Sequence, residues 1–349
     1  MRVIWRWLRH GVIALVFLIL LLLAPVGYVE VACRGDATGE AYQPIITTAD
    51  WQRAESRTLL TYPEWHIVHA YDDYARVIRD GDPHDFGYFR AIAGFWTSLC
   101  PLTERAAAMG GVTGATKTTI YTIGVSFTAE MLAKALYEET LGRVATWFRG
   151  SARAPLDDLS ALQAAQYAKF LQQTPWYKWD FNSGADALIS NAGPGFRDWE
   201  RRTALVIEYK GKAAYAGLIA RAVEDVGTDK LRLRSVVVGL DADALREIEG
   251  VTVIETLPEG IVIETNRYRA FTKIAERLAA AGANFVEVAG NDEILFTATS
   301  HSWKIRGSVH VMLRQGYGDI RYIFLVPVSS LADRLRNLDG LTLEHIHDY

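Results

Sequence analysis

The amino-acid sequence predicts a membrane-anchored α+β protein, and three observations lead to this fold class. Residues 11–29 form an apolar run of 19 residues without a charge, long enough to cross a bilayer as a helix. Between residues 61 and 226 apolar side chains recur with helical spacing, and after residue 227 short β-branched runs alternate with short helical segments. We therefore expect four parts: a transmembrane anchor (1–32), a tether (33–60), a helical domain (61–226) and a ferredoxin-like α+β domain (227–349).

Composition and charge exclude several classes of protein. The chain has 349 residues, of which 50% are hydrophobic and 22% charged, which is ordinary for a globular protein and excludes long disordered or collagen-like regions. The net charge of −4 is not accompanied by a strongly basic segment, so we expect no nucleic-acid partner. Two cysteines are too few for a disulfide-rich scaffold or a Cys-rich zinc module.

The apolar run has the flanks of an uncleaved single-pass anchor. Arg2, Arg6 and Arg9 precede it without an acidic residue, and the residues after it carry mixed charge. The positive-inside rule then places the N-terminus in the cytoplasm and the bulk of the chain in the periplasm, outside a bacterial inner membrane. A cleaved signal peptide or a lipoprotein at Cys33 are the alternatives, and Glu30 is unfavourable at the position that each would require.

The helical domain is expected to begin with a capping box, in which Thr61 is the N-cap, Pro63 lies in the first turn and Glu64 follows three residues after the cap. The segment 82–85 repeats this device before a second helix that ends near Leu99. Further helices are expected over Thr118–Phe148, Leu159–Gln172 and Asp198–Val223.

The C-terminal domain is expected to contain eight strands, three helices and two hairpins. The predicted strands are 234–240, 251–256, 260–265, 284–289, 293–299, 308–314, 319–328 and 341–346, with helices after Asp241 and over 271–281 and 330–338. Segments 236–256 and 324–346 align as strand, capped helix, glycine and strand, which leaves open a duplicated ferredoxin-like unit.

His66, His69 and Asp73 form the first candidate site, because their spacing places them on one face of the first helix. Imidazole and carboxylate groups together suit Zn²⁺. The opposite face carries the apolar side chains, so the alternative interpretation is a polar face directed to solvent.

His345 and His347 form the second candidate site, because alternate residues of a strand share a face. A third metal ligand would have to come from His301, His310 or Glu344. The strand is the last of the chain, and we expect it to fray rather than to hold a metal firmly.

Two other segments resemble known catalytic or phosphate-binding motifs, but each lacks a residue that the motif requires. Residues 110–118 lack the glycine that precedes the lysine of a phosphate-binding loop, and residues 124–128 end in Thr128 where a hydrolase nucleophile elbow has glycine. The aromatic cluster 176–181 is expected to pack between helices, with a membrane-interface contact as the alternative.

Several segments give the chain a family resemblance: TYPEWHIVHAYDDYARVI (61–78), IGVSFTAEMLAKALYE (123–138), TPWYKW (174–179) and LEHIHDY (343–349). In these the chain resembles a family of uncharacterised bacterial single-span membrane proteins. The resemblance implies a bacterial envelope setting and supplies no activity, ligand or catalytic residue.

The two cysteines, Cys33 and Cys100, have a single possible internal pairing. A periplasmic location would favour a disulfide between them, whereas lipidation of Cys33 or two buried free thiols are the alternatives.

No complete catalytic constellation is present in the sequence, so we expect a non-enzymatic periplasmic binding or assembly module without a cofactor. Its expected partners are the bilayer, through the N-terminal helix, and another envelope protein or a lipid. One alternative is a metal-dependent or hydrolytic envelope enzyme that uses the histidines above. The other is a carrier of a lipid-like apolar ligand held near Trp96, Trp147 and Trp176.

Overall fold

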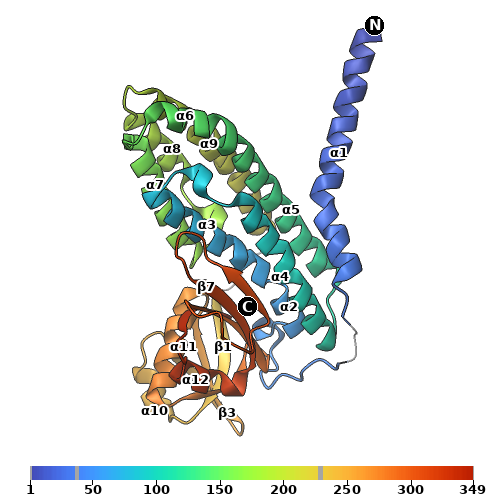
Figure 1. Ribbon diagram of the computed structural model, residues 1–349. Coiled ribbons are helices and arrows are strands. Elements are labelled where there is room, and N and C mark those ends of the chain that lie inside the picture. Colours follow the sequence, from blue (N-terminus) through green and yellow to red (C-terminus); the bar gives the residue numbers. More distant parts are fainter. Residues whose placement is uncertain (1, 36–38, 227–230, 349) are drawn as a thin grey trace.

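The computed structural model describes residues 2–35, 39–226 and 231–348, so the predicted domain boundary at residue 227 lies outside the described residues. The chain begins with a long helix, α1 (Arg2–Ala32), which extends away from the rest of the molecule (Figure 1). Within the described residues, the stretch Trp5–Ala32 of α1 is the one helix long and apolar enough to cross a membrane.

The segment after α1 is bound to the body of the molecule along its described part, in contrast to a free tether. It contains a short 3-10 helix (Ala49–Trp51) and α2 (Glu55–Leu59). The buried carboxylate of Glu287 accepts hydrogen bonds from the Ile46 amide (3.0 Å) and from the Tyr42 hydroxyl (3.2 Å). Residues 39–60 therefore form a strap that holds the C-terminal part of the chain.

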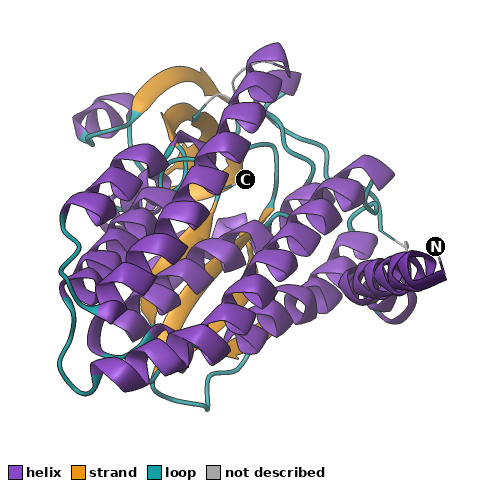
Figure 2. Ribbon diagram, turned by 90° about the horizontal axis from the view of Figure 1, so that it is seen from above, coloured by secondary structure: helices purple, strands orange, loops and turns teal. Residues whose placement is uncertain are grey.

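The central part is a bundle of helices, which Figure 2 shows lying over the strands. Its elements are α3 (Tyr62–Asp80), a 3-10 turn (Pro83–Asp85), α4 (Tyr88–Ala108), α5 (Gly114–Tyr137), a π-helical turn (Glu138–Gly142), α6 (Arg143–Arg149), α7 (Pro155–Leu171), a 3-10 turn (Trp176–Lys178), α8 (Phe181–Ser190) and α9 (Phe196–Val226).

Three features of the bundle differ from the sequence prediction. Helix α4 continues through Pro101, because the buried Leu99 and Leu102 keep both sides of the proline packed in the core. Helix α8 was not predicted. The expected capping box at Thr61 is not formed: Thr61 adopts a helical conformation and its hydroxyl donates to the Thr58 carbonyl (2.7 Å), because α2 leads almost directly into α3.

The C-terminal part consists of two antiparallel four-stranded sheets with three helices. The first sheet has the order β2-β3-β1-β4 and the second β6-β7-β5-β8. The elements are β1 (Arg232–Val238), α10 (Ala242–Glu247), β2 (Thr252–Leu257), β3 (Gly260–Asn266), α11 (Arg269–Ala281), β4 (Asn284–Val288), β5 (Glu293–Ser300), β6 (His310–Leu313), β7 (Ile320–Pro327), α12 (Val328–Arg336) and β8 (Thr342–His347).

The two sheets share one strand order, but the matching elements are not those that the sequence suggested. Strand β1 corresponds in sheet position to β5, and the unit β3-α11-β4 corresponds to β7-α12-β8. The aligned segments 236–256 and 324–346 therefore occupy different places in their sheets. Any strand, capped helix and strand has a similar pattern of Leu and Gly, which explains the misleading alignment.

Two hydrophobic cores organise the molecule. One lies within the bundle and reaches the second sheet through Leu295 and Ile323. The other joins both sheets to α11 and α12. The bundle and the second sheet thus share a packed boundary, and the residues predicted as site candidates lie along it.

Candidate functional site

The face of α3 that carries His66, His69 and Asp73 is buried, His66 against α4 and the other two against the second sheet, and each of these side chains is 5% exposed. The predicted solvent-facing orientation is therefore wrong. The opposite face of α3 also packs, with Tyr71 and Tyr74 in the core of the bundle. The pattern on one helix identified its apolar face correctly, but the partners of His69 and Asp73 on its polar face are supplied by strands that lie more than 200 residues away in the sequence.

His345 and His347 lie on β8, which pairs with β5 and is buried by α3 rather than frayed. The His345 ring stacks on Trp65, with ring centroids 3.6 Å apart, and its Nδ1 lies 3.1 Å from the Thr272 hydroxyl. The His347 ring lies edge-on to Tyr62 at 5.1 Å. The final strand is fixed because aromatic side chains of α3 cover it.

The two candidate sets meet in one buried cluster. The ring centroids of His345 and His347 are 4.8 Å apart, and those of His69 and His347 are 6.5 Å apart. Burial lowers the pKa of His69 and His345 well below the ordinary value, and it lowers the pKa of His347 to about 3. These imidazoles are therefore neutral at physiological pH.

A buried arginine joins the helix to the sheet. Arg321 of β7 is 1% exposed and donates two hydrogen bonds to Glu344 of β8, at 2.6 and 2.7 Å. It also lies 3.7 Å from Asp73, while His69 Nδ1 lies 3.7 Å from Glu344. A guanidinium group is buried only when it is paired, and here the bidentate carboxylate supplies the partner.

The two carboxylates of this network have opposite pKa shifts. Burial raises the pKa of Asp73 to about 7, although Arg321 opposes the shift. Burial acts in the same direction on Glu344, but the charges of Arg321 and the neighbouring groups outweigh it and leave its pKa below the ordinary value. Glu344 is therefore ionised, whereas Asp73 changes its charge near neutral pH.

A pocket of about 360 Å³ adjoins this network between α3, α4 and β6. Asp73, Arg321 and His66 contribute to its wall together with Arg90 of α4 and His310 of β6. Apolar and small side chains make up most of the remainder: Ala70, Ala91, Ala93, Gly94, Thr97, Val311, Met312, Leu313 and Gln315. A concave, mainly apolar site with a few polar groups and a carboxyl of shifted pKa is the usual form of a ligand site.

His66 presents one free acceptor beside this pocket. Its Nε2 lies 2.7 Å from the Ala91 carbonyl, which can only accept, so Nε2 carries the proton and Nδ1 has a lone pair. Nδ1 has no hydrogen-bond partner within the described structure. Gly94 permits this placement, because a Cβ at that position would collide with the His66 ring.

The turn between β6 and β7 fixes the far side of the pocket. The backbone amide of Gln315 donates to Asp73 Oδ2 at 3.0 Å. The side-chain amide of Gln315 accepts a hydrogen bond from the Gly87 backbone amide and donates one to the Gly87 carbonyl. Tyr317 donates to Asp72 at 2.8 Å. These contacts connect the hairpin to the C-terminal half of α3 and to the start of α4.

Sequence reasoning missed Arg90 and Arg321 as site residues. Arg321 had a signal: it is the one charge inside the apolar run Ile320–Val326, where a charge needs a buried partner. Arg90 had none, because an exposed arginine on a helix is ordinary and its position at the pocket depends on the docked hairpin.

The predicted metal candidates do not form a convergent ligand set. Among the described residues, the group of three whose ligand atoms all lie within 4.8 Å of one another is Asp82, His84 and Asp85. Asp82 and Asp85 are already engaged in the capping box of the 3-10 turn, and Asp82 pairs with Arg149 at 2.7 Å.

The segment 124–128 packs inside the bundle, and the tryptophans considered for a lipid site do not lie together. Thr128 accepts a hydrogen bond from the Trp96 indole (2.9 Å) inside the bundle, and Gly124 packs closely on Phe95. Trp147 is 76% exposed, whereas Trp96 is buried, so these two do not share an enclosed lipid site. The cluster 176–181 packs against the bundle core, as expected.

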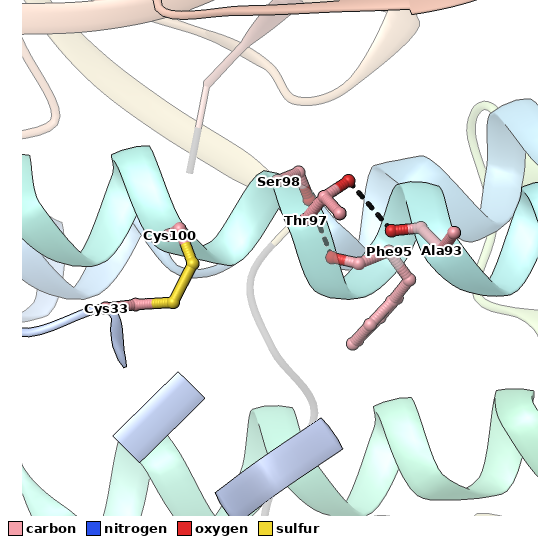
Figure 3. The surroundings of a disulfide bond; sticks show 6 residues. All are labelled: Cys33, Ala93, Phe95, Thr97, Ser98 and Cys100. Carbon is pink, nitrogen blue, oxygen red and sulfur yellow. Dashed lines mark hydrogen bonds between the residues drawn. A yellow bond between two sulfur atoms is a disulfide. The ribbon is translucent and has the colours of Figure 1, made fainter. Parts of the chain in front are cut away.

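Cys33 and Cys100 are joined as a disulfide, with Cα atoms 4.6 Å apart (Figure 3). Cys100 lies on α4 just after Thr97 and Ser98, whose hydroxyls donate to the carbonyls of Ala93 and Phe95. One turn before Cys33, Glu30 accepts hydrogen bonds from Lys117 (2.8 Å) and Tyr121 (2.6 Å) of α5. The end of α1 is thus fixed to the base of the bundle.

Comparisons of the chain with protein-family models, with curated proteins and with solved structures gave no match.

Proposed function

We propose that this protein is a membrane-anchored, non-enzymatic binding module whose pocket takes a small anion with an apolar portion. The observation that carries the proposal is the composition of the 360 Å³ pocket wall, in which Arg90 and Arg321 face a site otherwise lined by groups such as Met312 and Leu313. Arg321 is largely neutralised by Glu344, whereas Arg90 is exposed and makes no ion pair within the described residues. Arg90 is therefore the cation available to a ligand.

The same proposal places the module in the periplasm, with α1 spanning the inner membrane and the N-terminus in the cytoplasm. Three arginines before the apolar run support this orientation. The Cys33–Cys100 pairing also supports it, because disulfides persist in oxidising compartments. The C-terminal part would be a duplicated ferredoxin-like domain, which the shared strand order of the two sheets supports.

Matched ligands test the binding proposal with the full-length protein in lipid nanodiscs. Hexanoate, hexanol and hexylamine have equal apolar tails and differ in charge. We expect hexanoate to bind best and Arg90→Gln to weaken its binding about tenfold, the value of one hydrogen bond to a charged group. Arg306→Gln, which changes an exposed arginine outside the pocket, should have no effect. Equal binding of the three ligands, or an equal effect of both variants, would contradict the proposal.

An enzymatic function is the second candidate, and the Asp73 carboxyl supports it because a pKa of about 7 suits a general acid or base. Catalysis would require a substrate that is turned over and an Asp73→Asn variant that binds it without converting it. Binding without turnover in the wild-type protein would favour the binding module.

A further inference from the structure

The end of the helical bundle farthest from the sheets carries an apolar end patch, which we define as Leu141, Val144, Trp147, Phe148, Phe196 and Trp199. All six side chains are exposed, Trp147 to 76% and Phe148 to 66%. The four aromatic rings form a chain of contacts, from Trp147 to Phe148 (4.9 Å), to Phe196 (5.9 Å) and to Trp199 (5.8 Å). A contiguous exposed apolar surface of this kind marks an interaction site with a protein or a membrane.

Three arginines at this end of the bundle are turned inward and paired. Arg201 is fully buried with Glu138 at 2.6 Å, and Arg197 is buried with Asp157 at 2.9 Å. Arg149 completes the set through Asp82 and Asp157. An interior of ion pairs beneath an apolar surface is the reverse of the usual pattern of a soluble helix bundle.

Two charged pairs among the described residues near this end reach the surface: Arg143 with Glu139 at 2.6 Å, and Arg153 with Asp158 at 2.5 Å. A paired charge on long side chains is compatible with the headgroup region of a bilayer, where such groups reach polar surroundings. Trp147 and Trp199 are of the residue type that is enriched at this depth.

The direction of α1 identifies the partner. The disulfide and the contacts of Glu30 fix the end of α1 beside the start of α5. From this point α1 and the bundle both extend away from the sheets, so that the apolar end patch and the N-terminal half of α1 lie on the same side of the molecule (Figure 1). The end of the bundle that carries the patch therefore lies on the side of the molecule where a bilayer crossed by α1 would enclose the N-terminal half of that helix.

We infer that the apolar end patch inserts into the lipid bilayer that α1 spans, which gives the bundle a second membrane contact. The inference rests on the proposed anchoring by α1 and is independent of the ligand pocket. It orients the molecule with the end of the bundle in the membrane and with the two sheets directed away from it.

Photocrosslinking of the full-length protein in vesicles tests the inference. A photoreactive phenylalanine analogue, p-benzoylphenylalanine, replaces Phe148 or Phe196 in separate variants. The vesicles contain phosphatidylcholine and phosphatidylglycerol with a fluorescent lipid tracer. Leu18 on α1 is the positive control, and Trp303, 66% exposed on the loop between β5 and β6, is the matched negative control.

We expect lipid adducts at positions 148 and 196 with a yield comparable to that at position 18, and none above background at position 303. Lipid adducts at position 18 alone would overturn the insertion of the patch while leaving the anchor intact. A protein–protein adduct at position 148 or 196 would show that a second copy covers the patch and would also overturn the inference. Absence of adducts at position 18 would refute the anchoring proposal, and the inference with it.

Discussion

Arg321 shows how one buried charge arranges the residues around it. Its guanidinium group lies inside a strand of apolar neighbours, and leaving it unpaired there would cost several kcal/mol, about 3–5 by analogy with other broken buried pairs. Glu344 supplies the strong partner, which leaves Asp73 with a weaker contact at 3.7 Å. The unequal sharing of Arg321 explains why one carboxyl is held ionised while the other titrates near pH 7.

The first prediction concerns the pH dependence that Asp73 causes. Its folded-state pKa of about 7 lies above the ordinary value of 3.8, so the folded state favours the neutral carboxyl. Its contribution to stability is therefore complete below about pH 4 and is lost as the pH rises through about 7. Asp73→Asn should remove this loss. The free energy of unfolding of the variant should therefore rise relative to that of the wild type as the pH increases from 4 to 8.

Urea unfolding of the full-length protein across this pH range measures the difference. Other buried carboxyls, such as Glu55 and Asp348, shift in the same direction, so the wild-type curve must be subtracted from that of the variant. Asp80→Asn is the control, because Asp80 is mostly exposed. Parallel curves for wild type and Asp73→Asn would contradict the assignment.

At the scale of elements, the strap and helix α3 both join parts that the sequence separates. The strap (39–60) leads into α3. It contacts β4 through Glu287, and it contacts the start of β5 through Glu55, which accepts from the Asp292 and Glu293 backbone amides. Helix α3 then covers β8 with Trp65 and Tyr62. Bundle and sheets are thus connected by two consecutive segments of the chain.

The second prediction is that the strap depends on Glu287. This fully buried carboxylate accepts from two backbone amides and one hydroxyl, whereas a glutamine amide would turn a donor towards one of them. We expect Glu287→Gln to lower the free energy of unfolding by about 1–3 kcal/mol. Hydrogen exchange of residues 42–53 should accelerate at the same time.

Glu255→Gln provides the matched control for this measurement, because Glu255 is exposed on β2, which lies at the opposite edge of the same sheet from β4. Unchanged exchange of the strap in Glu287→Gln would show that other contacts hold it.

The third prediction revises the role of Thr61. Its hydroxyl bonds the Thr58 carbonyl and does not cap α3, so Thr61→Ala removes one hydrogen bond to a partly exposed group. We expect a loss of stability of about 0.5–1.5 kcal/mol, with ligand binding unchanged. Thermal unfolding and hexanoate titration check the two parts, and a loss of binding at unchanged stability would place Thr61 in a site.

At the scale of the whole molecule, the disulfide and the Glu30 contacts fix the end of α1 to the bundle. In the proposed membrane arrangement, this fixed connection determines which end of the bundle approaches the bilayer. The proposed membrane contact of the apolar end patch depends on this fixed position of α1 relative to the bundle.

The fourth prediction is that protein purified without reductant carries no alkylatable thiol and gains two after reduction, as measured by mass spectrometry. The bond closes a loop with a sequence separation of 67 residues, which the chain-entropy relation values at about 4 kcal/mol. A Cys33→Ser and Cys100→Ser double variant should lose stability of that order. Two free thiols in the unreduced protein would contradict the pairing.

The fifth prediction concerns topology. Alkaline phosphatase fused after Tyr349 should be active, because the basic residues in the first turns of α1, before its apolar run, retain the N-terminus in the cytoplasm. An inactive fusion together with an active cytoplasmic reporter at the same position would reverse the orientation.

The sequence by itself determined the local structure. The apolar run predicted α1, and helical and alternating patterns predicted most of the bundle and the strands, because these elements follow from short-range periodicity. It also named five residues of the buried cluster, although as two separate candidates. Pairing of the two cysteines was the one arrangement available for an internal bond.

Tertiary structure alone decided which surfaces face each other. The polar face of α3 could not be recognised as buried, because its partners Arg321 and Glu344 lie more than 200 residues away and no local pattern encodes that contact. The same reason hid the pocket, the strap and the apolar end patch, whose members come from separate helices or strands. Periodicity records which side of an element is polar, whereas the packing of distant elements determines whether that side meets water, a ligand or another charge.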